Sequence, residues 1–338
     1  MTTLTDLASL PAPSSYENAY SYGKQWSQQR SAAATTTQVH SLLYCGDRLL
    51  ACTSQGEICV WDSCSLESMA AEPSQRIAVV QGPLHTLLLP AASDAILLAA
   101  GSGGIYEITL DPLLQQYSTC RYPLPICAGA VVQNACVTSQ RVFGATNDGV
   151  LLQWDRSTGE VVQTITEEPT RRCQILYTSQ DKAYLGFSDG TVRLWGDNKA
   201  LFDLDAALGG TPGYTLANLL VYQCDWWVVA AWKGSPKDGS VLLTWHRPTE
   251  ALVAKVETRE QVRSLHMVDT QLATTGSDGR LHYRDPLTLE ETGSGVRCDT
   301  LSGYSVASST IGRVAVAGVG PSISLLEHQT LKLCTLTV

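Results

Sequence analysis

Charged side chains are scarce in this sequence, and long apolar runs are missing from it. Asp, Glu, Lys and Arg make up 16% of the 338 residues, against roughly a quarter in an average soluble protein. The formal net charge of −9 disfavours broad non-specific binding of nucleic acid, because that binding depends on Lys and Arg. No apolar run reaches the roughly 18 residues that a membrane-spanning helix needs. The first ten residues lack the charged start and apolar core of a secretory signal, so we expect a soluble, intracellular protein.

Motifs that bind metals are also missing. The 11 cysteines are an odd number and so cannot all pair within one chain, and they form no Cys-x-x-Cys. Cys45, Cys52 and Cys59 recur at a spacing of seven, which would suit a metal cluster, but they lie on three successive predicted strands. We interpret them instead as small buried thiols in a reducing compartment. The six histidines form no His-x-x-x-His, so we predict neither a metal site nor a cofactor.

Catalytic motifs are absent as well. The glycine-rich stretch at residues 101–104 precedes a predicted strand, and no Lys-Ser/Thr follows it, so it is not a phosphate-binding loop. No Gly-x-Ser-x-Gly occurs. The carboxylates Asp148, Asp189, Asp238 and Asp278 are interpreted as turn formers, because Asp tolerates the backbone angles of tight turns. We therefore predict a protein that is not an enzyme.

What the sequence does contain is a repeated hairpin, most clearly at residues 187–195 (FSDGTVRLW). A Ser-Asp-Gly turn separates two short apolar runs of strand length and composition. Equivalent turns return along the chain at intervals of 40 to 49 residues. Their glycines are Gly56, Gly104, Gly149, Gly190, Gly239, Gly279 and Gly320.

Tryptophan marks the end of the second strand in several of these hairpins. Trp61, Trp154 and Trp195 lie five residues after their turn glycine, and Trp245 lies six after. Thr109 and Arg284 occupy this position in the second and sixth copies. An apolar-x-Ser/Thr-Leu sequence precedes three of the hairpins, at residues 39–42, 84–87 and 262–265, and predicts the inner strands of a repeated sheet.

This period, with Trp-Asp closing the third strand of each repeat, resembles the WD40 family of β-propellers. The resemblance covers about nine-tenths of the chain and implies an all-β, seven-bladed WD40-type propeller over residues 38–338. Four strands can be counted after Arg297, so the last blade is expected to be built wholly from the C-terminal segment. The Gly-His pair typical of the family is missing, which implies that stability depends more on apolar packing between blades.

Residues 1–37 do not fit the repeat and are expected to form an N-terminal extension. Ser14 and Glu17 form a capping box, which predicts a short helix running to about Ala33. Two roles are open for this extension: it packs against the side of the propeller, or it docks a partner. Its aromatic residues Tyr16, Tyr20 and Trp26 are the candidate partner-binding residues, because Tyr and Trp are enriched in interface hot spots.

The last third of the chain resembles the subunit 6 family of the THO complex, part of the TREX machinery that couples transcription to mRNA export. Four segments carry the resemblance: 225–226 (Asp-Trp), 243–246 (Leu-Thr-Trp-His), 258–259 (Thr-Arg) and 333–336 (Leu-Cys-Thr-Leu). It implies a non-catalytic scaffold in mRNA processing and export, nuclear and possibly also cytoplasmic. The implied partners are other THO-type protein subunits, without sequence-specific nucleic acid, membrane or small-molecule substrate.

A substrate receptor of a cullin-4 ubiquitin ligase is the alternative. Such receptors share a Trp-Asp-x-Arg ending, whereas Arg156 here follows Asp155 directly, one residue too early. The first repeat, Trp-Asp-Ser-Cys at residues 61–64, has no arginine. A scaffold in another intracellular assembly is a further alternative, and the sequence offers nothing that separates it from the first two.

Overall fold

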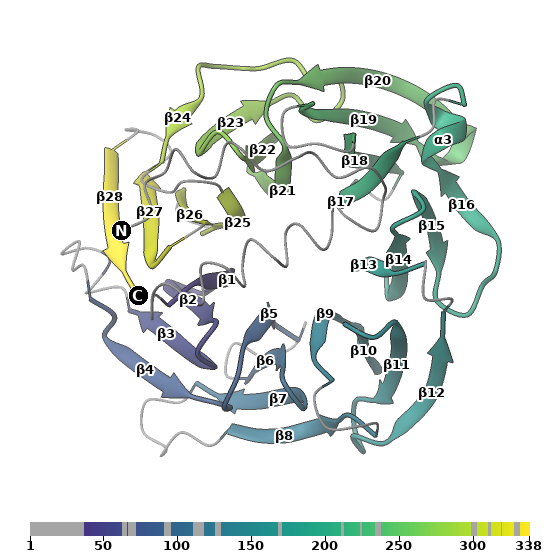
Figure 1. The fold of residues 1–338 in the computed structure, drawn as a ribbon. Helices are drawn as coiled ribbons and strands as arrows, with labels where there is room; N and C mark the ends of the chain where they lie inside the picture. Colours follow the sequence, from purple (N-terminus) through teal and green to yellow (C-terminus); the bar gives the residue numbers. More distant parts are fainter. Residues whose placement is uncertain are drawn as a thin grey trace, which may run out of the picture.

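Seven four-stranded sheets are arranged around a common axis (Figure 1). The computed structural model describes residues 37–338 except for 63–65, 67–71, 91–95, 111–117, 126–129, 168–170, 211–212, 224, 234–237, 299–302, 310–311, 319 and 328–331. Within each sheet, or blade, four consecutive strands pair antiparallel in chain order, from the innermost to the outermost. The expected all-β propeller with seven blades is confirmed.

The strands of the first four blades are, blade by blade, β1 (Val39–Cys45), β2 (Arg48–Thr53), β3 (Glu57–Trp61) and β4 (Gln75–Ala78); β5 (Leu84–Leu88), β6 (Ile96–Gly101), β7 (Gly104–Thr109) and β8 (Ser118–Pro123); β9 (Val132–Val137), β10 (Arg141–Thr146), β11 (Val150–Asp155) and β12 (Val161–Thr166); β13 (Cys173–Ser179), β14 (Lys182–Phe187), β15 (Thr191–Leu194) and β16 (Ala200–Asp203).

The strands of the last three blades are β17 (Tyr214–Tyr222), β18 (Trp226–Lys233), β19 (Ser240–His246) and β20 (Ala251–Thr258); β21 (Val262–Val268), β22 (Gln271–Gly276), β23 (Arg280–Arg284) and β24 (Val296–Arg297); β25 (Gly303–Ser308), β26 (Arg313–Gly318), β27 (Ser322–Glu327) and β28 (Lys332–Thr337). Among the described residues, the short helical turns α3 (Leu204–Ala207) and η2 (Arg247–Thr249) interrupt this pattern.

The predicted hairpins are the connections between the second and third strand of each blade. In the fourth blade, β14 and β15 pair through Gly186 and Val192, and the turn glycine Gly190 has φ +85°. At Gly56 of the first blade φ is +81°, and a Cβ would lie 1.9 Å from the Val80 carbonyl oxygen. Only glycine fits there, because it has no Cβ and accepts a positive φ at no steric cost.

In the part of the chain that the structure describes, the ring closes without exchange of a strand between its ends. The seventh blade consists of β25 to β28, all from the C-terminal segment, as the strand count predicted. One apolar cluster joins it to the first blade, and includes Leu42, Trp61, Ala317 and Leu336. The first and last blades are therefore held together by side-chain contacts rather than by a shared sheet.

The core of the protein is divided among the boundaries between blades. Each boundary has its own cluster of buried apolar side chains: Leu50 with Leu97 between blades one and two, for example, and Leu98 with Trp154 between blades two and three. The other boundaries follow the same plan. Both faces of each blade are thus covered, which explains the non-alternating apolar sequence of strands such as β18.

The marker tryptophans differ in how deeply they are buried. Trp61 and Trp154 are fully buried, whereas Trp195 and Trp245 are only partly buried. In the sixth blade Arg284 takes the tryptophan position and is 4% exposed. The short helix expected from the capping box at Ser14 to about Ala33 lies outside the described residues. In the described part of the chain, no helix has the length and apolar character to cross a membrane.

Each inner strand also carries a β-bulge, at its second residue in six blades and at its fourth residue, Ala217, in β17, so that this residue has no partner on the second strand. The residue after the bulge is polar in most blades and bonds to the neighbouring blade. Thr86 Oγ1 donates to the Gln133 carbonyl (3.1 Å), and Asn134 Nδ2 donates to the Gln174 carbonyl (2.8 Å). This is the role of the Ser/Thr in the predicted inner-strand sequence.

At the point of closure, the Leu42 N–H donates to Ser305 Oγ across 3.0 Å. We expect Ser305→Ala to lower the free energy of unfolding by about 1–3 kcal/mol, because Leu42 is buried and its N–H would lose its acceptor. Urea denaturation checks this, with Ser294→Ala in an exposed loop as the control. Equal unfolding midpoints for the two variants would show that this bond does not stabilise the closure.

Candidate functional site

The bulged residues of the inner strands bring two histidines together. His40 of β1 and His85 of β5 stack with their ring centroids 4.8 Å apart and their planes 6° apart. His40 Nδ1 donates to the Leu84 carbonyl at 2.7 Å. Burial lowers the pKa of both rings, that of His85 to about 4, so both are neutral near pH 7. No third metal-ligating side chain joins them among the described residues, and their equivalent positions reflect the repeat, as predicted.

A second cluster of ionisable groups lies between the fifth and sixth blades. Asp278 comes from the β22–β23 turn, His282 and Arg284 from β23, Glu260 from the β20–β21 connection, and Glu291 from the segment before β24. His282 Nε2 lies 2.8 Å from Asp278 Oδ2, and its Nδ1 lies 3.4 Å from Glu291 Oε1. Arg284 Nη2 lies 2.7 Å from Glu291 Oε1 and 3.5 Å from Glu260 Oε1.

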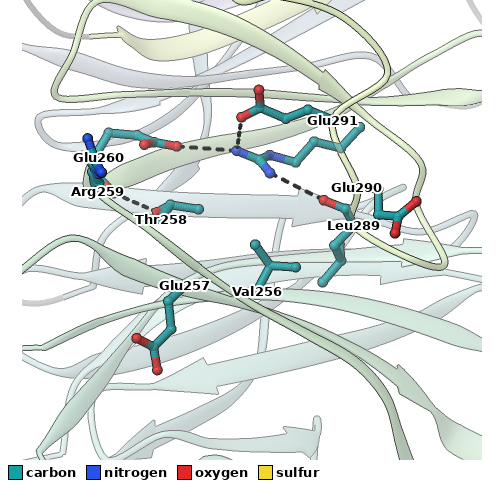
Figure 2. A pocket seen from close by; sticks show the side chains of 9 residues that line it. Val256, Glu257, Thr258, Arg259, Glu260, Leu289, Glu290 and Glu291 are labelled. Atoms are coloured by element: carbon teal, nitrogen blue, oxygen red, sulfur yellow. Dashed lines mark hydrogen bonds and ion pairs between the residues drawn. The ribbon is translucent and has the colours of Figure 1, made fainter.

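Three members of this cluster, Glu260, Arg284 and Glu291, line an open groove of about 450 Å³ (Figure 2). One wall is the end of β20 and the residues after it, and the other is formed by Arg284 at the end of β23 and the segment between β23 and β24. The groove residues are Val256, Glu257, Thr258, Arg259, Glu260, Arg284, Leu289, Glu290 and Glu291.

The electrostatics of the cluster follow from its contacts. The hydrogen bond to Asp278 raises the pKa of His282, and the charges of Asp278, Glu260 and Glu291 add to that effect. Burial raises the pKa of Glu260. Arg284 places one cation among three carboxylates, and the raised pKa of His282 favours a second. The Nη1 of Arg284 also donates to the Leu289 carbonyl at 3.2 Å.

Glu260, Asp278 and His282 have donor atoms close enough together to hold a metal ion. The arrangement fits a metal poorly, however. Metal binding needs a neutral imidazole, whereas the carboxylates around His282 favour its charged form. The Arg284 guanidinium already pairs with Glu260 and Glu291, and its positive charge would repel a metal cation. We therefore interpret the cluster as an internal ion network that holds blades five and six together.

Sequence reasoning missed this cluster. From the sequence, Asp278 was interpreted as a turn former, and the six histidines were found to form no metal-binding motif. Two signals were present: Asp278 and His282 are separated by four residues across a hairpin turn, and Arg284 replaces the marker tryptophan. A buried arginine needs carboxylate partners, but Glu260 and Glu291 come from segments whose approach only the folded chain reveals.

The other candidate residues have different outcomes. Tyr16, Tyr20 and Trp26 lie outside the described residues. Cys45, Cys52 and Cys59 are all buried, and burial raises the pKa of Cys52 to about 12. Among the described residues no cysteine belongs to a group that could hold a metal.

Comparison with known proteins supports the fold of this chain but does not identify its function. No protein-family model matches the sequence, and no curated protein matches it. The WD40 β-propeller domain of Doa1 is similar in structure, with a TM-score of 0.62 and 14% identity over 83% of this chain and 90% of that one. The computationally designed protein Ika8 has a TM-score of 0.60 and 17% identity over 88% of this chain and 86% of that one.

The fold is therefore that of a seven-bladed WD40-type β-propeller. Propellers of this kind generally act as scaffolds that bind other proteins. At these identities the similarity establishes the fold alone, because one fold can carry many functions.

The raised pKa of His282 gives a pH-dependent prediction. A histidine whose pKa rises on folding stabilises the fold fully below its unfolded pKa, and this contribution is lost as the pH rises through the folded pKa. We expect His282→Gln to lower the free energy of unfolding more at pH 5.5 than at pH 9, as measured by urea denaturation.

His85→Gln is the matched control with the opposite sign. Because burial lowers the pKa of His85, the wild-type protein is destabilised at this site as the pH falls below the unfolded value. The difference in free energy of unfolding between the wild type and His85→Gln should therefore favour the wild type less at pH 5.5 than at pH 9. The same pH dependence for both variants would contradict the assigned network.

Proposed function

We propose that this chain is a non-catalytic scaffold that binds other proteins. The observation that carries the proposal is the closed ring itself, in which an apolar cluster at every boundary fixes each blade to the next. Such a ring presents loops on two faces and outer strands at its rim without large rearrangement. Its best-formed cluster of ionisable groups is paired internally, which favours a structural role over catalysis.

We further propose that the assembly is of the THO/TREX type, acting in mRNA processing and export. Two of the four segments that resemble the THO complex subunit 6 family, 225–226 and 243–246, meet at one end of the fifth blade. The segment 258–259 lies at the other end of that blade, and 333–336 belongs to β28 of the seventh blade. Trp226 stacks against His246 with ring centroids 4.4 Å apart, and Arg247 donates its N–H to the Asp225 carbonyl at 2.9 Å. Trp226 is half-buried at the end of β18, so part of its ring is accessible to a partner.

Affinity purification of the tagged full chain tests this proposal. We expect the wild-type chain to recover other THO subunits and to be at least partly nuclear. Trp226→Ala should reduce that recovery, because Trp is the residue type whose loss most often weakens an interface. Val253→Ala, on the outer strand of the same blade, is the control.

The alternatives predict different co-purifying proteins. Recovery of the cullin-4 adaptor without any THO subunit would support a substrate receptor instead. Asp155 and Arg156 of the Trp-Asp-Arg sequence are both engaged within the third blade: Asp155 pairs with Arg141, and Arg156 Nη1 donates to the Ser139 carbonyl at 3.3 Å. Recovery of neither group would contradict both assignments.

The N-terminal extension is the proposed docking segment, through Tyr16, Tyr20 and Trp26. If it docks a partner, replacing the three by alanine should abolish at least one interaction and leave the melting temperature nearly unchanged. If it packs on the propeller instead, the same variant should lose several kcal/mol, the usual scale for burying large aromatic side chains. Calorimetry with co-purification distinguishes the two. A variant that melts early and binds every partner would contradict docking.

A further inference from the structure

The outermost strand of the third blade, β12, is unusual among the seven outer strands. Its sequence, Val-Val-Gln-Thr-Ile-Thr, has no charge and no proline, and five of its six residues are β-branched. Charges, prolines, short length and β-bulges are features that keep an edge strand from pairing with another chain. A bulge is present in β12, as it is in β8, β16 and β20, so the bulge does not set β12 apart, whereas the absence of the other three features does. The other outer strands have such features: Arg76 in β4, Arg121 and Pro123 in β8, Lys255 and Glu257 in β20, Lys332 in β28, and lengths of four and two residues in β16 and β24.

Both faces of β12 are accessible to solvent. Five of its six residues are exposed, and Val161 and Val162 are 40% and 51% exposed. These two valines are half of the large apolar residues that are exposed in the described part of the chain. Val162 is the extra residue of a β-bulge, between Val161 and Gln163 that pair with Trp154 and Gln153 of β11. The two valines together place apolar surface at the rim.

The backbone of β12 offers unpaired hydrogen-bonding groups along its outer edge. The Glu167 N–H donates to the Gly149 carbonyl at 3.3 Å, and the register then pairs Ile165 with Leu151 and Gln163 with Gln153. Because hydrogen-bonded pairs alternate in an antiparallel ladder, Gln163 and Ile165 bond inward to β11. The N–H and C=O groups of Thr164 and Thr166 point outward, and none of the described residues pairs with them.

The strand is also held in place from the neighbouring blade. Trp195 Nε1 donates to Gln163 Oε1 at 3.0 Å. The Trp195 ring packs on Phe143 of the third blade, with centroids 4.8 Å apart. These contacts hold β12 in place in the absence of a partner, which reduces the conformational entropy that is lost on binding.

We infer that β12 is the docking edge for an extended, uncharged segment of a partner polypeptide, which adds to the third blade as a fifth strand. The inference rests on the proposed scaffold function and names one surface for it. An open row of N–H and C=O groups is complemented by an extended backbone, as in β-strand addition, whereas a helix satisfies its own backbone groups. A charged occupant would find no counter-charge on β12, and Val161 and Val162 favour apolar or β-branched side chains.

The test uses the full chain and a synthetic peptide, acetyl-Lys-Thr-Val-Thr-Val-Thr-Val-Thr-Lys-amide, as the probe. We expect binding to slow amide hydrogen exchange at Thr164 and Thr166, whose N–H groups point outward. Thr164→Pro removes the outward N–H and leaves the inward ladder to β11 intact, and proline is tolerated on edge strands in this orientation. It should weaken peptide binding at least about fivefold.

Thr164→Val is the matched control, because it keeps the N–H and the β-branched shape and should bind as the wild type does. Val162→Lys is a second test, since it adds an edge charge without touching the inward ladder; it too should weaken binding. Equal binding by all four proteins, no binding by the wild type, or protection on another strand would overturn the inference. Protection of β12 that appears without peptide as protein concentration rises would assign the edge to a second copy instead.

The same variants separate this inference from the proposed function. If wild-type chain and Thr164→Pro recover the same protein partners, the scaffold function stands and docking at β12 fails. If the wild type recovers no partner while the peptide protects β12, the scaffold assignment fails and the docking edge stands.

Discussion

Packing between neighbouring blades is the constraint on which the rest of this structure depends. Among the described strands none passes from one blade into another, so no described sheet ties the first blade to the last. The closure depends on the same kind of contact as every other boundary: a buried apolar cluster and a backbone hydrogen bond near the inner strands, here from Leu42 to Ser305. Because each boundary is built independently, local substitutions can vary the chemistry of one boundary while the ring persists.

The boundary between blades five and six shows such a variation. Where the first and third blades bury a tryptophan, the sixth buries Arg284, and the buried charge requires Glu260 and Glu291 beside it. His282 then bonds to the turn carboxylate Asp278 from within the same hairpin. The sixth blade thus has a His–Asp contact even though the Gly-His pair typical of the WD40 family is missing from the sequence. Glu260, Arg284 and Glu291 of this network also line an open groove.

The sequence allowed the fold to be predicted because the hairpin repeats seven times, so each weak copy is supported by the others. Turn glycines such as Gly190 are required by the local backbone conformation, so their spacing can be recognised directly in the sequence. The site could not be predicted in the same way. Glu260 and Glu291 lie on either side of β23 and belong to connections of no regular pattern, and only tertiary packing brings them to Arg284. The aromatic residues of the extension lie outside the described residues, so their role stays a prediction.

A closed ring removes edges between blades but leaves one outer strand exposed on each of them. Exposed strand edges are sites where other chains can pair, so their sequences are expected to oppose pairing unless pairing is useful. Six of the outer strands here contain a charge or a proline or are very short, and β12 has none of these features. Its β-branched composition adds little to the buried core, since five of its residues are exposed. That composition is therefore explained better by an interaction at the rim than by the stability of the blade.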